Sequence, residues 1–361
     1  MQPRGKKHVT MGVAGVAAIA AAVALSACSS SPKPSGSGSS PSAVALSGTL
    51  NGAGSTFQTT FQQAAISSFK SVESGMTVNY DAVGSGTGRS DLAAGTVNYA
   101  GSDSPIPSTE TANFKGKTVL YFPVVIGPIT MSYNLPGVSG LKLTPTVIAN
   151  IFQGNITSWN DPAIAAVNPG VTLQSTPITL AVRSDSSGTT QNFSLFLQTA
   201  VPSVWKLGSS STISWPHSAR AGAGNSGVAQ IVKSTAGAIG YVDYADAKAS
   251  GLTFASVQNS SGKFIAPSTT AASASASTAT VASDLTFHAV WGSNAAAYPI
   301  TYQSWILAYA RQPNASDAKL LQAYIGYLIG AGQQLLPQLN YAPLPAGIDS
   351  MAKAQLSKIT G

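Results

Sequence analysis

Three loops of the sequence are rich in glycine, serine and threonine, the residue types that bind small oxyanions. They cover residues 52–57, 84–88 and 183–189, each between a predicted strand and a predicted helix. Glycine lets the backbone approach a ligand closely, hydroxyl groups donate hydrogen bonds, and the N–H groups at a helix N-terminus attract anions. A single loop of this kind is most often only a helix cap or a turn. Three of them at strand ends indicate an anion-binding site.

Two charged residues could give this site its selectivity. Asp103 follows a short apolar stretch, where it either caps a helix or turn or faces the ligand. A carboxylate in the site would repel a fully ionised anion but would accept a hydrogen bond from an anion that keeps a proton. Phosphate keeps a proton near neutral pH and sulfate does not, so Asp103 would favour phosphate. Arg183 would supply a planar, permanently charged guanidinium group for the oxygens of the ligand. Asp185 either orients this guanidinium or forms only a surface ion pair with it.

Several other kinds of site are excluded or unsupported. None of the three loops has the pattern of a nucleotide P-loop, a dinucleotide-binding turn or a nucleophile elbow. The single cysteine, Cys28, cannot form an internal disulfide, and cysteine-rich zinc sites are impossible. His8, His217 and His288 do not have the spacing of metal ligands. The sequence therefore predicts neither a metal nor a cofactor.

The composition is that of a folded protein with few charged residues, which is compatible with an anionic ligand. Of the 361 residues, 44% are hydrophobic and only 9% are charged. The length suits two domains or one large domain with a substantial core. The formal net charge is +7, but Arg4, Lys6 and Lys7 lie in a predicted leader, so the mature chain is only mildly basic. We therefore predict no nucleic-acid partner.

The N-terminus has the pattern of an export signal, which we assign to residues 1–27. A charged start precedes an uncharged run over 12–27, which is shorter than the roughly 20 residues of a membrane-spanning helix. The run ends in Leu25-Ser26-Ala27-Cys28, which resembles a bacterial lipobox, in which the cysteine is acylated. The alternative is an ordinary secretory signal in which Cys28 is incidental. Residues 28–47 are predicted to be a Ser/Pro/Gly tether.

Strands and helices alternate along the rest of the chain, which predicts an α/β fold. Strands are expected over 78–80, 178–182 and 238–242, and helices over about 58–69, 90–94, 146–152, 162–167, 187–199, 228–234 and 317–330. The apolar stretch 119–131 predicts buried strands interrupted at Gly127-Pro128. Residues 304–310 fit a strand or a helix. The Ser/Thr/Ala-rich stretch 268–283 fits a loop or a solvent-facing helix about equally well.

The loop sequences together resemble the PstS-type phosphate-binding proteins, the receptors of phosphate ABC importers. The matching segments are Gly52-Ala53-Gly54-Ser55-Thr56-Phe57, Gly84-Ser85-Gly86, Ala100-Gly101-Ser102-Asp103, Arg183-Ser184-Asp185-Ser186-Ser187-Gly188-Thr189, Gly224-Asn225-Ser226-Gly227 and Tyr341-Ala342-Pro343. Their order and spacing are kept from about residue 48 to near the C-terminus. Two departures are visible: Ser186 stands where the family often has glycine, and the stretch 268–283 is unusually rich in Ser, Thr and Ala.

The resemblance implies which residues contact phosphate. They are Thr56, Phe57 through its backbone N–H, Ser85, Asp103, Arg183, Ser187, Gly188 and Thr189, with Asp185 orienting Arg183. It also implies a two-lobed periplasmic-binding-protein-like fold of type II with hinge strands. One lobe would comprise 48–127 plus 298–361, and the other 128–297.

The implied function is an extracytoplasmic, lipid-anchored receptor on the cell membrane that gives phosphate to the membrane subunits of an ABC importer. We expect a monomer that is not an enzyme. Two other functions remain open at this point: a phosphatase-like hydrolase, and a surface interaction protein that keeps the fold. Within the binding class, sulfate and molybdate are the alternative ligands, and Asp103 argues against both.

Overall fold

The computed structural model describes residues 45–361, and Ala45–Gly361 form one compact unit. The predicted signal peptide 1–27, the predicted lipid-attachment residue Cys28 and most of the predicted tether 28–47 lie outside the described residues. Between residues 45 and 361, no helix combines the length and the apolar character that crossing a bilayer requires.

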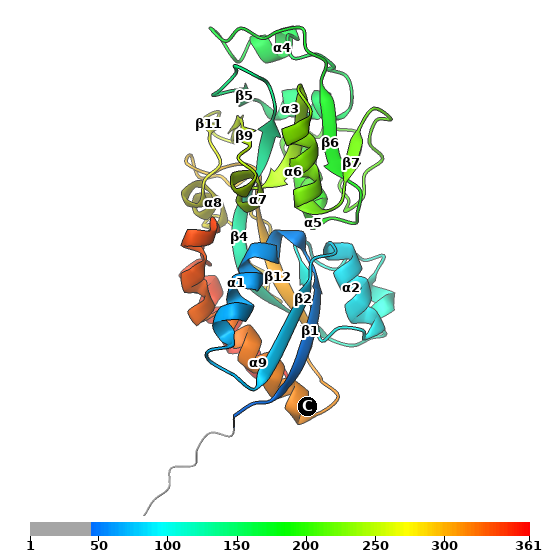
Figure 1. Cartoon of the computed structure of the whole chain (residues 1–361), viewed down its shortest axis with the longest axis vertical. Helices are drawn as coiled ribbons and strands as arrows, with labels where there is room; N and C mark the ends of the chain where they lie inside the picture. Colours follow the sequence, from blue (N-terminus) through cyan, green and yellow to red (C-terminus); the bar gives the residue numbers. More distant parts are fainter. Residues whose placement is uncertain (1–44) are drawn as a thin grey trace, which may run out of the picture. The chain divides into compact units, whose positions relative to one another are not determined.

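A mixed sheet of nine strands runs through this unit (Figure 1). Its order is β2-β1-β3-β12-β4-β8-β6-β7, with β9 also paired to β4. The strands are β1 Gly48–Gly54, β2 Met76–Asp81, β3 Tyr99–Ser102, β4 Val119–Tyr133, β6 Thr179–Arg183, β7 Arg220–Gly222, β8 Ala238–Asp243, β9 Thr253–Phe254 and β12 Thr301–Tyr309. A second, small sheet joins β5 Lys142–Leu143, β10 Ser256–Gln258 and β11 Phe264–Ile265.

Helices flank the sheet and connect its parallel strands. They are α1 Thr59–Phe69, α2 Ser85–Ala94, α3 Pro145–Phe152, α4 Pro162–Ala165, α5 Gly188–Ala200, α6 Gly224–Ser234, α7 Tyr244–Ala249, α8 Thr269–Ala276, α9 Ala315–Leu328 and α10 Ala346–Gln355. Short 3-10 turns add η1 Thr56–Gln58, η2 Thr111–Phe114, η3 Ala331–Leu335, η4 Pro337–Leu339 and η5 Leu356–Lys358. Figure 1 shows α1 and α9 on one side of β1 and β2, and α2 on the other. The α/β prediction is confirmed, and the largest differences from the predicted bounds are at α2 and α6, which begin five and four residues earlier than expected.

The long strand β4 differs from the sequence prediction. We expected an interruption at Gly127-Pro128, but β4 continues through both residues to Tyr133. The two residues pair with β12, which ends its pairing with β4 at this point, and from Ile129 onward β4 pairs with β8 on its other edge. Proline has no N–H to donate, and a position where a strand exchanges neighbours tolerates this loss. One strand thus serves both halves of the sheet.

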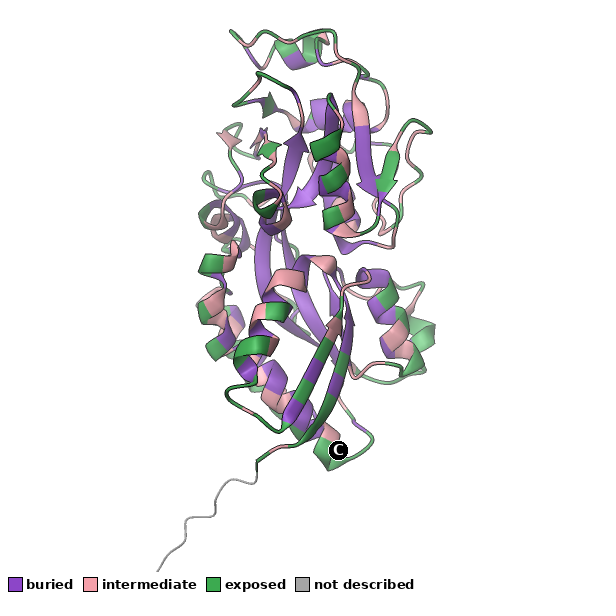
Figure 2. Cartoon of the chain, in the orientation of Figure 1, coloured by how far each residue is buried: buried purple, intermediate pink, exposed green. Residues whose placement is uncertain are grey.

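The core lies along the central strands, which are buried throughout in Figure 2. Every residue of β4 from Leu120 to Tyr133 is buried. Aromatic rings fill the space beside it: Phe57 stacks on Tyr302 with ring centroids 4.1 Å apart and meets the edge of Tyr341 at 5.2 Å. Of the stretch 304–310, predicted as a strand or a helix, residues 304–309 belong to β12.

The stretch 268–283 contains a short helix, α8, with one face in the core. Ala271, Ala272, Ser275 and Ala276 are buried, and the helix contacts β4 and β12. A solvent-facing helix is therefore a wrong prediction for this segment. The small side chains that suggested exposure are here because they let the helix backbone lie close to two buried strands.

Burial of α8 can be tested by placing a charge on each of its faces. Ala272 is fully buried, so Ala272→Glu should destabilise the fold by about 3 kcal/mol, because the new carboxylate has no partner there. Ser277, at the exposed end of the helix, gives the matched control, and Ser277→Glu should change stability by less than about 0.5 kcal/mol. Urea denaturation measures both. Equal, small effects would place α8 on the surface.

Candidate anion-binding site

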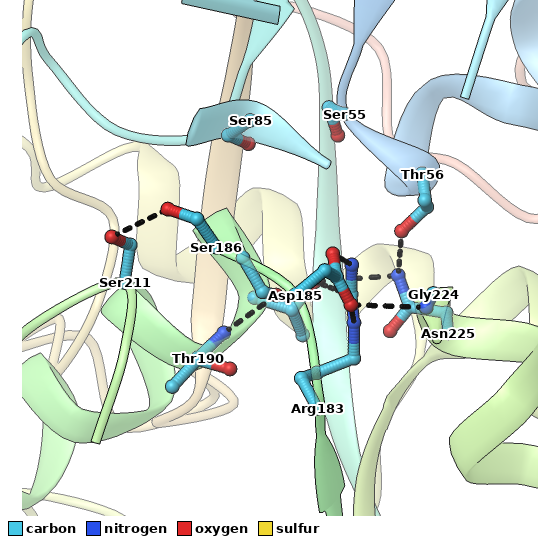
Figure 3. A network of polar contacts seen from close by, with 12 residues as sticks. Ser55, Thr56, Ser85, Arg183, Asp185, Ser186, Thr190, Ser211, Gly224 and Asn225 are labelled. Atoms are coloured by element: carbon cyan, nitrogen blue, oxygen red, sulfur yellow. Dashed lines mark hydrogen bonds and ion pairs between the residues drawn. The ribbon is translucent and has the colours of Figure 1, made fainter. Parts of the chain in front are cut away.

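The three predicted loops meet at the carboxyl ends of parallel strands. Strands β1, β2 and β3 are parallel to one another and lead into η1, α2 and Asp103, respectively. Strand β6 is parallel to β7 and β8, and it leads into α5. Figure 3 shows Ser55, Thr56 and Ser85 from the first group of elements facing Arg183, Asp185 and Asn225 from the second. Carboxyl ends of strands are where ligands bind in open α/β sheets.

Ser85, Asp103 and Gly188 come into direct contact. The hydroxyl of Ser85 donates to Asp103 Oδ2 at 3.3 Å and accepts from the Asp103 backbone N at 3.2 Å. A Cβ added to Gly188 would lie 2.5 Å from Ser85 Oγ and 2.6 Å from Asp103 Cβ. Because real Cβ atoms do not approach this closely, only glycine permits the N-terminus of α5 to reach this carboxylate.

The carboxyl of Asp103 is 1% exposed and is surrounded by hydrogen-bond donors. Ser304, from β12, donates to Oδ1 at 2.5 Å, while Asn192 and Gln303 donate to the backbone oxygen at 2.6 and 3.3 Å. Burial raises the pKa of Asp103 above its ordinary value, although the hydrogen bond from Ser304 and the charge of Arg183 oppose that rise. The group is therefore a buried acceptor whose protonation responds to pH above the usual carboxylate range.

Arg183 and Asp185 form the ion pair predicted from their spacing. The Arg183 Nε donates to Asp185 Oδ1 at 2.8 Å, and Nη2 contacts Oδ2. Asp185 also accepts from the backbone N of Gly224 at 3.1 Å. Burial raises the pKa of Asp185, but the hydrogen bonds and charge of Arg183 outweigh this and hold the pKa below its ordinary value. Because Arg183 is only 5% exposed, this is not a surface ion pair, and Asp185 fixes the plane of the guanidinium.

The third loop ends in the first turn of α5. Ser187 caps this helix, and its Oγ accepts from the backbone N of Thr190 at 3.1 Å. The Thr189 hydroxyl, fully buried, accepts from Arg183 Nη1 at 3.4 Å. Ser186, which departs from the family pattern, donates to Ser211 at 2.9 Å and accepts at its backbone oxygen from Gly86 N at 3.0 Å. The first turn of α5, whose Thr190 N–H is capped by Ser187, therefore faces the second loop.

The first loop places Thr56 and Phe57 at the same end of the sheet. The Thr56 hydroxyl accepts from Asn225 Nδ2 at 3.0 Å. The backbone N of Phe57 donates to Ser55 Oγ at 3.1 Å, so the N–H predicted to reach phosphate has a partner within its own turn here. The side chain of Phe57 lies in the aromatic core. The contacts bring the other predicted residues together, whereas their binding of phosphate remains a prediction.

Three buried side chains to which the sequence analysis gave no role support these loops, although Asn225 lies in the matching segment Gly224-Asn225-Ser226-Gly227. Asn225 donates to threonines of the first and third loops, and Ser304 donates to the Asp103 carboxylate. Arg89 contacts the residues on either side of Asp103. Arg89 pairs with Glu110 at 2.7 and 2.8 Å, and its Nη1 donates to the hydroxyls of the two serines that flank Asp103, Ser102 and Ser104. Arg89 sits one helical turn after Ser85, a spacing visible in the sequence, whereas Ser304 is 201 residues from Asp103 and gives no local signal.

The groups that converge at the site have the chemistry of anion ligands. Among residues 45–361, no group of three or more His, Cys, Asp or Glu side chains is placed to hold a metal ion. The polar groups that converge are hydroxyls, a guanidinium and the start of a helix, with Asp103 as an acceptor. Such a set matches a small oxyanion that carries a proton.

Comparisons with known proteins agree with this composition. A family model described as the PBP superfamily domain matches residues 39–331. The phosphate-binding protein PstS of Haemophilus influenzae is 34% identical over 327 residues, covering 86% of this chain and 93% of that protein. The chain belongs to the PstS family of the PBP superfamily. The phosphate-binding protein PstS 3 of Mycobacterium leprae is 35% identical over 312 residues, which is 84% of each chain.

Solved structures share the fold of this family. A high affinity periplasmic phosphate-binding protein, PfluDING, bound with phosphate, has a TM-score of 0.71 at 21% identity and covers 85% of this chain and 94% of its own. A phosphate-binding protein from Stenotrophomonas maltophilia has a TM-score of 0.67 at 20% identity, covering 85% and 93%. The predicted two-lobed periplasmic-binding-protein-like fold is thereby confirmed. The lobe boundaries stay a prediction.

The close approach of α5 to Asp103 can be tested at Gly188. The Gly188→Ala methyl group would push the third loop away from Ser85 and Asp103, so we expect phosphate affinity to fall by at least about 10-fold with the fold intact. Gly347, also in the first turn of a helix, has open space around its Cβ position, so Gly347→Ala should leave affinity unchanged. Isothermal titration measures both. Wild-type affinity in Gly188→Ala would show that the loops need not meet.

The role of Asp103 as an acceptor predicts how selectivity depends on pH. Because the pKa of Asp103 is raised, the carboxylate gains a proton at a higher pH than an ordinary aspartate, and the protonated form can donate to sulfate. Phosphate preference over sulfate should therefore fall as pH is lowered from about 8 to about 5. The Asp103→Asn variant has an amide NH₂ group that can donate at every pH, so its preference for phosphate over sulfate should be reduced throughout this range. A preference that this substitution leaves unchanged contradicts the proton-reading role.

Proposed function

We propose that this protein is an extracytoplasmic receptor that binds inorganic phosphate between two lobes and delivers it to the membrane subunits of an ABC importer. The observation that carries the proposal is the buried Asp103 carboxylate in contact with the N-terminus of α5 and within the field of Arg183. An acceptor among cationic and hydroxyl donors suits an anion that still has a hydrogen to donate. The names of the relatives support the same ligand.

Each predicted contact residue has a role in this proposal. Arg183, oriented by Asp185, binds the ligand oxygens electrostatically, and Asp103 accepts the ligand proton. The remaining residues would donate hydrogen bonds: Thr56, the Phe57 backbone N–H once it leaves Ser55 Oγ, Ser85, Ser187, Gly188 and Thr189. For Ser85 to donate to phosphate, its hydroxyl must turn away from Asp103 Oδ2, and the long 3.3 Å contact makes that exchange inexpensive.

We assign the lobes to 48–127 plus 298–361 and to 128–297. On that division several hydrogen bonds join the lobes, among them Gly86 N to Ser186 O at 3.0 Å and Asn192 Nδ2 to Asp103 O at 2.6 Å. Phosphate would add its own contacts to these and so favour the closed arrangement. The importer subunits would then recognise that arrangement.

The cellular setting of the proposal comes from the sequence. Acylation of Cys28 after removal of residues 1–27 would fix the protein to the outer side of the cell membrane, with residues 28–47 as a tether. We infer a monomer that acts without a cofactor and does not catalyse a reaction. Turnover of a chromogenic phosphate ester by the metal-free protein would instead support a hydrolase. Normal phosphate uptake after deletion of the protein would support a surface interaction role.

Titration with phosphate, sulfate and arsenate tests the proposed function directly. We expect phosphate to bind at least about 100-fold more tightly than sulfate, because sulfate has no hydrogen for Asp103. Arg183→Ala should weaken phosphate binding by about 100-fold and reduce its salt dependence, because it removes the charged contact. Tryptophan fluorescence would follow lobe movement, and Lys353→Ala, an exposed ion-pair residue, is the control. Failure of the wild-type protein to bind phosphate would refute the function.

A further inference from the structure

Asn225 lies at the meeting point of the first and third loops. It is the second residue of α6 and is 1% exposed. Its Nδ2 donates to Thr56 Oγ1 at 3.0 Å and to Thr189 Oγ1 at 3.3 Å, and its Oδ1 accepts from the backbone N of Asp243 at 3.3 Å. The side chain therefore connects η1, α5 and the end of β8, three segments that are distant in the sequence.

The orientation of the Asn225 amide follows from these partners. A backbone N–H can only donate, so the atom that faces Asp243 N must be the amide oxygen. The NH₂ group consequently faces the two threonine hydroxyls, and each of its hydrogens serves one of them. Asn225 thus acts as a donor to both hydroxyls.

This assignment determines what the hydroxyls can do. A hydroxyl has one hydrogen and two lone pairs. Thr189 Oγ1 accepts from Asn225 Nδ2 and from Arg183 Nη1, so both of its lone pairs are used and only its hydrogen remains. Thr56 Oγ1 accepts from Asn225 in the same way. Thr56 Oγ1 keeps one lone pair besides its hydrogen, so both hydroxyls retain a hydrogen that they can donate to a ligand.

We propose that Asn225 is a positioning residue that fixes the Thr56 and Thr189 hydroxyls as donors toward the bound anion. The inference rests on the proposed function, since it assumes that phosphate binds at these loops. On this proposal the site has one acceptor, Asp103, and two threonine hydroxyls that act as donors because the Asn225 amide donates to their oxygens. Thr56 and Asn225 lie on the two different predicted lobes. The hydrogen bond from Asn225 that orients the Thr56 hydroxyl can therefore form only when those lobes meet.

Replacement of Asn225 by aspartate keeps the shape and reverses the polarity. The carboxylate would still accept from Asp243 N, but its second oxygen would accept from the threonine hydroxyls and turn their hydrogens away from the ligand. The charged and titratable groups around it are Asp243, which it contacts, and four groups that interact with its partners or chain neighbour: Arg183 at Thr189, Asp185 at Gly224, Asp246 at Asp243, and Tyr302 at Thr189 and Asp243. Most of these are acidic, so the introduced carboxyl gains a proton, and with it a donor, as the pH falls.

The test is isothermal titration of inorganic phosphate into the full-length protein and its variants. At about pH 8 we expect Asn225→Ala to weaken binding about 10-fold and the isosteric Asn225→Asp to weaken it at least about 100-fold, with part of the loss regained near pH 5.5. A purely structural role would make the larger cavity of alanine the more harmful change. An Asn225→Asp variant that binds as well as Asn225→Ala would overturn the proposal.

Asn168 provides a matched control for burying a carboxylate. It is also buried, its Oδ1 accepts from the backbone N of Lys142, and its Nδ2 donates to two backbone oxygens. Asn168→Asp should lower thermal stability without changing phosphate affinity or its pH profile. A pH-dependent loss of binding in Asn168→Asp equal to that of Asn225→Asp would attribute the effect to folding and overturn the proposal.

A double-mutant cycle separates orientation of the hydroxyls from simple charge repulsion. Because Asn225 acts partly through the Thr56 hydroxyl, Asn225→Ala should cost about threefold or less in a Thr56→Val background, against about 10-fold alone. Additive losses would overturn the proposal, whether or not Asn225→Asp folds. Wild-type protein that does not bind phosphate refutes the proposed function itself, whereas binding by wild type with additive variants refutes only the role of Asn225.

Discussion

A buried carboxylate without a positive partner in direct contact is the constraint around which this site is organised. The Asp103 side chain is almost inaccessible to water, and its burial opposes ionisation. The surrounding structure compensates with hydroxyl donors from Ser85 and Ser304 and with the field of Arg183. Arg89 holds the serines on either side of Asp103. Under the proposed function, a hydrogen on the ligand would be a further donor to this carboxylate, and that requirement would make the acceptor selective.

The fold brings these groups together through the ends of parallel strands. β1 to β3 and β6 to β8 point their carboxyl ends at one place, so short loops deliver hydroxyls, a helix N-terminus and the Arg183–Asp185 pair without long excursions of the chain. The approach is so close that Gly188 has no room for a side chain. The close packing of the loops therefore requires glycine at position 188, and the proposed anion site would require the same close approach.

The sequence predicted the loops better than it predicted their supports. Glycine, serine and threonine clusters, the Arg183-Asp185 spacing and the position of Asp103 are local signals, and the structure brings those residues together. Ser304 and Asn225 act through contacts that span 201 and 169 residues, which no local pattern encodes. The continuous β4 was missed because Gly127-Pro128 normally ends a strand, and only the exchange of neighbours from β12 to β8 explains why it does not. The buried face of α8 was missed because alanine and serine do not reveal which side of a helix is covered.

The uninterrupted passage of β4 through both halves of the sheet has a mechanical consequence. Two domains joined only by a flexible linker can reorient independently of each other. A shared strand, paired along most of its length with β12 and then with β8, resists shear and stretching because those movements would break its ladder. Strands tolerate a range of twist without losing their pairing, so rotation of one half of the sheet against the other is the movement that this pairing opposes least. Under the proposed function, the contacts of a bound phosphate would act on that rotation.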